Sequence, residues 1–198
     1  MAGKERKVFC IGLSKTATTS LTKALQILGY KSKHFPMRLL KYDEEGLKFD
    51  FSGAEKYDAL SDLPVVRFYK KLDRNFQASK FILTTRELED WLDSCRRHFW
   101  PGQILKGDFW FNRLHKDIYG TVDYDEEKFK EAYKTHKKDV LSYFSGREED
   151  LLIMDITDGE DWEKLCSFLE EPIPDRDFPE TDCLYSKIFK VLKIHLLR

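Results

Sequence analysis

Short apolar runs alternate with helix-spaced apolar positions along most of the chain. Residues 8–11 form a run of apolar, branched and aromatic side chains, which predicts a buried strand. Apolar residues then recur at helical spacing from residue 18, and Gly29 ends the pattern. A second short strand is expected over residues 30–35, before Pro36. Strand, helix and strand in this order form the unit that builds a parallel sheet.

Further elements repeat this alternation. Strands are expected at 80–86 and 151–156, helices at 65–76, directly after residue 86, at 123–144 and at 162–169. Residues 37–47 read as a surface helix or helical turn, and 57–64 as a loop. The pattern therefore predicts an α/β fold, with a central parallel sheet flanked by helices on both faces.

Composition limits the possible classes of protein. The chain has 198 residues, of which 41% are hydrophobic and 14% aromatic, enough for one core and a single domain over 1–198. The net charge of −1 gives no overall field that would attract nucleic acid, so an anion site must be built from a few placed cations. No nucleic-acid partner is expected, and oligomeric state stays open.

The cysteines and the first residues indicate a compartment. Cys10, Cys95, Cys166 and Cys183 are far apart and show no metal-ligand spacing, which is typical of reduced thiols. Residues 1–7 are charged and run directly into the first strand, without a signal peptide or a transmembrane span. We expect a cytoplasmic protein without a resident metal.

A loop rich in hydroxyl groups joins the first strand to the first helix. Gly12 is followed by small hydroxyl residues around Lys15, at the start of a helix, where free N–H groups and the helix dipole favour an anion. In the phosphate loop of ATP- and GTP-binding proteins, the lysine follows a second glycine. Lys15 follows Ser14 instead, so this loop does not match that motif. The ordinary alternative is a turn whose hydroxyls serve as helix caps.

The loop resembles the 5′-phosphosulfate loop of sulfotransferases that use 3′-phosphoadenosine 5′-phosphosulfate (PAPS). The resemblance implies that these residues bind the co-substrate: Ser14, Lys15, Thr16, Ala17, Thr18 and Thr19. Lys15 would also be catalytic. Ala17 stands where that family often has glycine, so it would be strained if the loop needs positive φ there.

A second motif resembles the 3′-phosphate site of the same family. Arg86 closes the strand at 80–86, and Ser94 lies two turns into the following helix. A guanidinium can donate two parallel hydrogen bonds to a phosphate. Glu87 replaces the aspartate that usually follows the arginine. By itself, Arg86 could also be an ordinary surface residue at a strand end.

The resemblance extends to about Pro179, through the closing strand, the helix at 162–169 and a proline-rich exit. It implies a three-layer P-loop sulfotransferase-like fold and an enzyme that moves a sulfuryl group from PAPS, without a metal, to a hydroxyl or amine of a small-molecule or glycan-like acceptor. The aromatic segment 99–119 would form the acceptor pocket, a lid over it, or core. Residues 186–198 read as a basic amphipathic helix that packs on its own domain or contacts a membrane surface or subunit.

The general base remains open between two residues. His34 ends the strand at 30–35, and strand ends in parallel sheets face the ligand crevice; the alternative is a histidine that only caps the strand or faces solvent. Asp62 is a second candidate base, although helix capping is its simplest role.

Two rival functions remain: a nucleoside or small-molecule kinase, and a catalytically silent nucleotide-binding protein.

Overall fold

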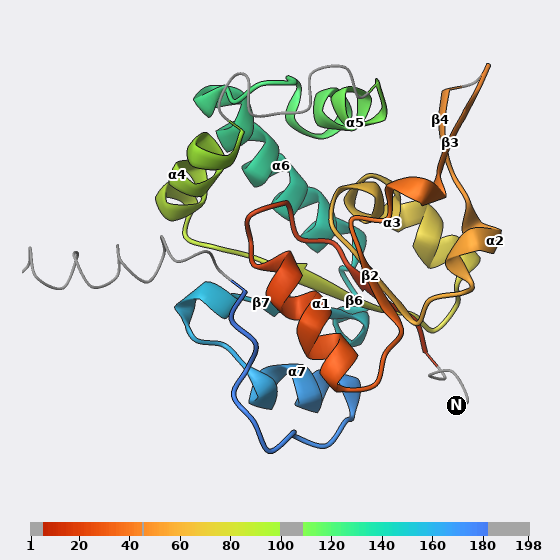
Figure 1. The fold of residues 1–198 in the computed structure, drawn as a ribbon, viewed down its shortest axis with the longest axis vertical. Helices are drawn as coiled ribbons and strands as arrows, with labels where there is room; N and C mark the ends of the chain where they lie inside the picture. The colour runs from red at the N-terminus through yellow and green to blue at the C-terminus, as the bar shows by residue number, and fades with distance from the viewer. Residues whose placement is uncertain (1–5, 45, 100–108, 182–198) are drawn as a thin grey trace, which may run out of the picture.

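The computed structural model describes residues 6–44, 46–99 and 109–181 (Figure 1). Within these ranges, its strands are β1 Val8–Cys10, β2 Ser32–His34, β3 Leu40–Asp43, β4 Gly46–Phe49, β5 Ala59–Ser61, β6 Lys80–Thr84 and β7 Leu151–Met154. Its α-helices are α1 Thr18–Ile27, α2 Phe51–Ala54, α3 Leu63–Asn75, α4 Leu88–His98, α5 Phe109–Tyr119, α6 Glu126–Tyr143 and α7 Trp162–Leu169. Single 3₁₀ turns are η1 Met37–Leu39, η2 Glu148–Asp150 and η3 Ile156–Asp158.

The described part of the chain forms a parallel five-stranded sheet in the order β2-β5-β1-β6-β7. The predicted α/β class is confirmed. The strand order moves outward from β1 in both directions, with β5 and β2 on one side and β6 and β7 on the other. A crevice at the carboxyl ends of the strands is therefore expected beside β1, where the order reverses.

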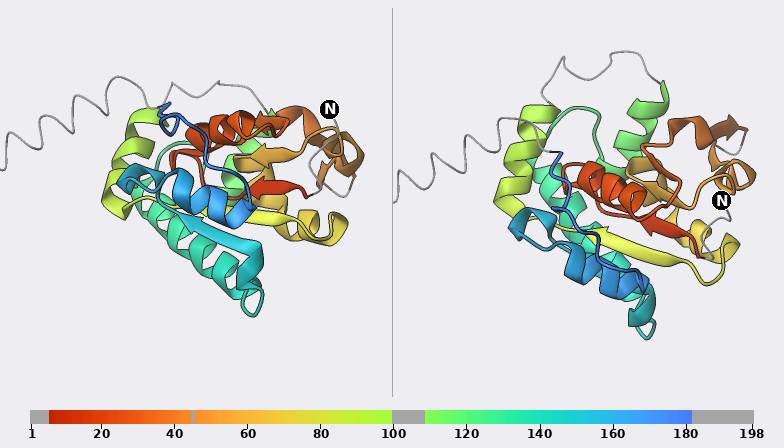
Figure 2. Two further views of the ribbon diagram at one scale, coloured as in Figure 1. Left: turned by 90° about the horizontal axis from the view of Figure 1, so that it is seen from below. Right: turned by 60° about the horizontal axis from the view of Figure 1, so that its bottom comes forward.

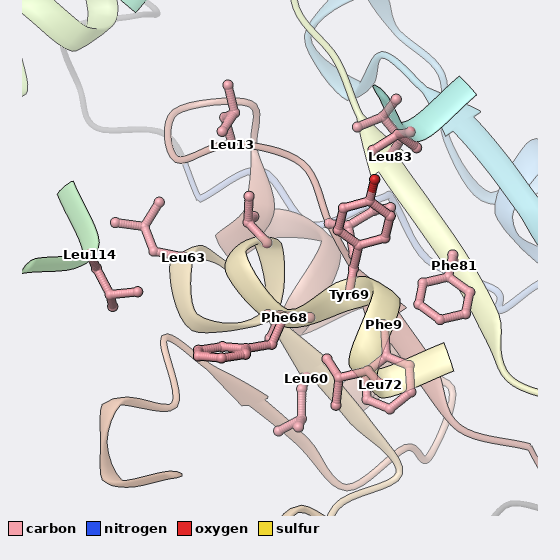
Figure 3. Packing of buried hydrophobic residues seen from close by; sticks show 14 of the residues in the cluster. Phe9, Leu13, Leu60, Leu63, Phe68, Tyr69, Leu72, Phe81, Leu83 and Leu114 are labelled. Carbon is pink, nitrogen blue, oxygen red and sulfur yellow. The ribbon is translucent and has the colours of Figure 1, made fainter. Parts of the chain in front are cut away.

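The two faces of the sheet are covered by different helices (Figure 2). Phe9 of β1 faces the larger core, with α3, α4, α5 and α6, whereas Val8 and Cys10 face the smaller one, with α1 and α7. This alternation follows from the period of two along a strand. Figure 3 shows the larger core, in which Tyr69 and Leu72 of α3 lie near Phe9. The three predicted layers result from helices on both faces.

Two predictions of local structure are wrong. Residues 37–47 form η1, β3 and the start of β4, because Leu40 pairs with Phe49 and Tyr42 with Leu47 in an antiparallel hairpin, instead of the expected helix. Residues 59–61 form β5 within the expected loop. All three residues of β5 are buried between β1 and β2, so the strand shows no polar alternation that the sequence could display.

The other predicted elements are present with small shifts at their ends. The helix at 162–169 agrees with α7, and Asp62 does cap α3, since its side chain accepts a hydrogen bond from the N–H of Leu63. Gly29 ends α1 with a φ of 86°. The segment 186–198, for which a helix is expected, and Cys183 lie outside the described residues.

Candidate active site

The loop between β1 and α1 is fixed from the side of the sheet. Adding a Cβ to Gly12 would place it 1.8 Å from Oγ1 of Thr84 in β6, so only glycine fits here. The hydroxyl of Thr16 donates to the carbonyl of Leu13 (2.7 Å) and lies 2.6 Å from Oγ1 of Thr84. Thr16 therefore anchors the loop to the sheet through its hydroxyl, and its contact with a co-substrate stays a prediction.

Helices α4 and α6 also hold the loop. Nε1 of Trp91 donates to the carbonyl of Ser14 (2.9 Å), and Nε2 of His136 lies 2.7 Å from the carbonyl of Ile11. Trp91 is fully buried. These hydrogen bonds fix the backbone conformation of the loop at the end of the sheet.

The end of the loop has the conformation of an anion-binding turn. Lys15 and Ala17 both have left-handed backbones, with φ of 74° and 65°. The strain expected at Ala17 is confirmed, because its backbone has the left-handed conformation that glycine prefers and that a Cβ makes unfavourable. Ala17 precedes α1, and no side chain caps this N-terminus. No side chain therefore occupies the first N–H groups of α1. These groups remain available as donors to a bound anion.

Asp62 joins the loop to the end of β2. Its Oδ1 accepts hydrogen bonds from Oγ of Ser14 (2.5 Å) and the N–H of Leu63 (2.7 Å). Its Oδ2 accepts from Oγ1 of Thr18 (3.0 Å) and lies 2.9 Å from Nε2 of His34. Four donors therefore surround this carboxylate, which is 5% exposed.

The charge of Asp62 is held by these donors. Burial by itself raises the pKa of the carboxyl, but the hydrogen bond and charge of His34, with the bonds from Ser14 and Leu63, together lower it below the ordinary value of 3.8. Asp62 is therefore ionised near neutral pH. Its backbone, at φ 78° and ψ −169°, lies in a region used almost only by glycine.

A cavity of about 380 Å³ opens beside these residues. Its described lining comes from the loop, α1, β2 and the ends of α3, α4 and α5, together with Thr181: Ser14, Lys15, Ala17, Thr18, Thr19, His34, Phe35, Asp62, Leu63, His98, Phe99, Phe111 and Thr181. Of the sequence-predicted site residues, the structure thus brings Ser14, Lys15, Ala17, Thr18, Thr19, His34 and Asp62 together around one cavity.

Backbone strain also concentrates here. Among the described residues, six non-glycine residues have positive φ, and four of them line the cavity: Lys15, Ala17, Phe35 and Asp62. Each such residue costs of order 1 to 3 kcal/mol and persists only where the surroundings impose it. Clustering of this kind is typical of functional sites, and it marks the cavity independently of any motif.

Arg86 and Ser94 are not among the described lining residues of this cavity; Arg86 lies between β6 and α4, and Ser94 lies within α4. The hydroxyl of Tyr133 holds both backbone polar groups of Arg86, accepting from its N–H (3.1 Å) and donating to its carbonyl (2.5 Å). Nε of Arg86 is buried and has no hydrogen-bond partner among the described residues. The pKa of Cys95, next to Ser94, is raised by burial and lowered in part by the charges of Lys15 and Arg86, so both cations lie within electrostatic reach of α4.

Several lining residues were not predicted as site residues. Phe35 ends an expected strand, Leu63 lies in the expected loop 57–64 and His98 lies in the helix after residue 86, and only the folded chain brings them to one cavity. Of the aromatic segment 99–119, residues 100–108 lie outside the described residues. Phe99 and Phe111 line the cavity, whereas Tyr119 is buried in the core, so an acceptor role for this segment stays a prediction. Within the described ranges, no three His, Cys, Asp or Glu side chains gather as metal ligands, and no helix is long and apolar enough to cross a membrane.

Comparison with known proteins identifies the family and supports the fold. The family model described as a sulfotransferase domain matches residues 7–183. The chain is 26% identical over 222 residues to Ava biosynthesis cluster protein M of Aspergillus versicolor, covering 87% of this chain and 79% of that protein. A crystal structure of a sulfotransferase from Alicyclobacillus acidocaldarius superposes with a TM-score of 0.55 at 14% identity, covering 97% of this chain and 91% of that one.

The fold and the loop thus define a sulfotransferase-type α/β protein. The family match covers most of the chain, and the chain belongs to the sulfotransferase domain family. The structural superposition, at this low identity, supports the fold alone.

Proposed function

We propose that this protein transfers the sulfuryl group of PAPS to a hydroxyl group of a small acceptor. The observation that carries the proposal is a pair of cations whose charges both reach Cys95 of α4: Lys15 in the loop and Arg86 after β6, whose buried Nε has no described partner. A buried unpaired guanidinium donor is costly, so a bound anion is its natural partner. The donor has two such anionic ends, the 5′-phosphosulfate and the 3′-phosphate.

The loop would bind the 5′-phosphosulfate end. The start of α1 has N–H groups without a side-chain cap, and Lys15 and Thr19 line the cavity, with the hydroxyl of Thr19 3.3 Å from Nε2 of His34. As the S–O bond to the donor phosphate breaks, Lys15 would stabilise the negative charge that develops on the phosphate oxygen. Sulfuryl transfer, like phosphoryl transfer, needs mainly positioning and charge stabilisation.

His34 is the better candidate for general base. The four hydrogen bonds to Asp62 occupy both of its oxygens, and its lowered pKa makes it a poor proton acceptor. Because an ionised carboxylate only accepts, Nε2 of His34 carries a proton, which leaves Nδ1 as the acceptor of the neutral ring. His34 would take the acceptor's proton while the acceptor oxygen bonds to sulfur. Asp62 would be a positioning residue.

Calorimetry with adenosine 3′,5′-bisphosphate, AMP and ATP tests the proposal. The bisphosphate should bind more tightly than AMP, and Arg86→Ala should abolish that preference at a cost of about 2 to 4 kcal/mol. Arg96→Ala is the matched control, because Arg96 is an exposed residue of α4 paired with Asp93. Equal binding of the bisphosphate and AMP, or preferred magnesium-dependent binding of ATP, would overturn the proposal and favour a kinase.

A further inference from the structure

The cavity has two chemically different sides. The polar side consists of the loop and the start of α1, with His34 and Asp62 at its edge. The other side is apolar and aromatic, made by Phe35, Leu63, Phe99 and Phe111. If the polar side holds the donor, the aromatic side is left for the acceptor.

The aromatic side is rigid. Leu63 and Phe99 are 1% and 3% exposed, so neither can move without disturbing the core. The rings of Phe35 and Phe111 meet edge to face with centroids 6.2 Å apart. Phe111 in turn packs on the buried ring of His115, with centroids 4.1 Å apart. Such a wall offers ring faces and edges at fixed positions, which suits a planar aromatic ligand.

The charges around the cavity argue against a charged acceptor. The ionisable side chains in its described lining are Lys15, His34, Asp62 and His98. Lys15 is assigned to the donor, and the Asp62 carboxylate is already surrounded by four donors, so neither is left to pair with an acceptor. Loss of water and the charge of Lys15 lower the pKa of His98, which is therefore neutral near pH 7. Among the described lining residues, a sulfated glycan or a cationic amine would therefore find no partner charge.

The volume also restricts the acceptor. At about 380 Å³, the cavity is at the lower end of the range for small-molecule sites and must also admit the sulfuryl end of the donor. This volume suits an acceptor of one or two rings better than an oligosaccharide.

We propose that the acceptor is a small uncharged phenol whose ring lies against Phe35, Phe99 and Phe111, with its hydroxyl at His34. This inference rests on the proposed function. A phenol, with a pKa near 10, gives up its proton to an imidazole far more readily than an alcohol, which is about as weakly acidic as water. The phenolic O–H proton goes to His34, the phenolic oxygen forms the new O–S bond, and the electron pair of the broken S–O bond leaves on the bisphosphate.

A direct test measures kcat/KM with radiolabelled PAPS for 2-naphthol, cyclohexanol, N-acetylglucosamine and hexylamine. We expect 2-naphthol to exceed each of the others by about 100-fold or more. Preferred sulfation of the sugar, the amine or cyclohexanol would overturn the phenol inference and leave the sulfotransferase proposal intact. So would binding of adenosine 3′,5′-bisphosphate without sulfation of 2-naphthol. No bisphosphate binding would instead defeat the proposed function itself.

Substitutions in α5 locate the ring. Phe111→Leu should raise KM for 2-naphthol about tenfold and Phe111→Ala more, while affinity for adenosine 3′,5′-bisphosphate stays within twofold. Phe109→Ala is the matched control, since Phe109 belongs to the same helix, is 56% exposed and does not line the cavity. If Phe111→Ala does not fold, the milder Phe111→Leu still provides the test. Thermal unfolding shows whether each variant is folded. Unchanged KM in folded Phe111 variants would contradict this placement of the ring.

Discussion

Nε2 of His34, at the end of β2, lies 2.9 Å from Oδ2 of Asp62, the residue that precedes α3. Asp62 also accepts hydrogen bonds from Ser14 and Thr18 on either side of Lys15. One buried carboxylate thus joins the phosphate-type loop to the candidate base. Changes at Asp62 should therefore affect the orientation of the base and the position of the loop together.

Replacing Asp62 with asparagine tests this link. Asp62→Asn removes the charge that holds His34 and should lower kcat about 100-fold or more, by analogy with other positioning carboxylates next to a histidine base. Binding of adenosine 3′,5′-bisphosphate should change less than tenfold. The control is Asp161→Asn, since Asp161 caps α7 through the N–H of Glu163, away from the cavity. An unchanged kcat for Asp62→Asn would show that His34 needs no carboxylate.

The pH dependence of stability follows from the lowered pKa of Asp62. Because the folded pKa lies below the ordinary value of 3.8, the ionised carboxylate contributes stability above about pH 4, which is lost as the pH falls through the folded pKa. The difference in Tm between the wild type and Asp62→Asn should therefore be largest near neutral pH and shrink below about pH 4. Thermal unfolding between pH 7 and pH 3 measures it. A constant difference would mean that Asp62 acts only through uncharged hydrogen bonding.

Gly12→Ala should damage both the fold and the donor site. The new Cβ would lie 1.8 Å from Oγ1 and 2.6 Å from the carbonyl oxygen of Thr84, so β6 or the loop must shift, at a cost of about 1 to 3 kcal/mol or more. Thr84→Ala in the same chain should restore only part of this stability, because the carbonyl contact remains. Chemical denaturation measures both.

The control for Gly12→Ala is Gly146→Ala. Gly146 has positive φ and no atom near its added Cβ, so only backbone strain of about 1 kcal/mol is expected there. Equal losses at Gly12 and Gly146 would contradict the close approach of the loop to β6.

Trp91→Phe should weaken the loop without removing the ring from the core. It deletes the Nε1 donor to the carbonyl of Ser14 and should cost about 1 to 3 kcal/mol of stability, because that carbonyl is buried. Affinity for adenosine 3′,5′-bisphosphate should fall as well. Trp162→Phe deletes the equivalent bond to the carbonyl of Arg176, remote from the cavity, and should leave affinity unchanged. Equal affinities of the two variants for adenosine 3′,5′-bisphosphate would show that the Trp91 hydrogen bond does not position the loop for binding.

Ala17→Gly should be tolerated and stabilising. Ala17 has a φ of 65° and a ψ of 28°, where glycine has no steric penalty, so a gain of about 0.5 to 1 kcal/mol in the free energy of unfolding is expected. Affinity for the bisphosphate should be retained. The opposite sign is expected for Ala24→Gly inside α1, which should cost about 1 kcal/mol. A loss of stability for Ala17→Gly would mean that the methyl group has a packing role.

The sequence revealed the elements whose patterns are local. Residues 8–11 and 80–86 are recognisable strands because the apolar runs are bounded by polar residues, and α7 matches its predicted range because its apolar spacing and flanking prolines are clear. The hairpin of β3 and β4 was misread because Leu39, Leu40 and Leu47 also fit a helical period. Cross-strand pairing, which decides between the two, is not visible in a short stretch.

By itself, the sequence determined the fold class and the strand–loop–helix units that contain Lys15 and Arg86, because local periodicity encodes them. The phosphate-binding roles of these two cations are implied by the family resemblance and stay a prediction. Only the tertiary structure decided that His34 and Asp62 meet, that Thr16 faces the sheet, and that Phe99 and Phe111 face the same cavity as Lys15. Those relationships depend on the sheet order, which brings the end of β2 and the start of α3 beside the loop. The spacing of residues along a chain does not predict which strand ends become neighbours in the sheet.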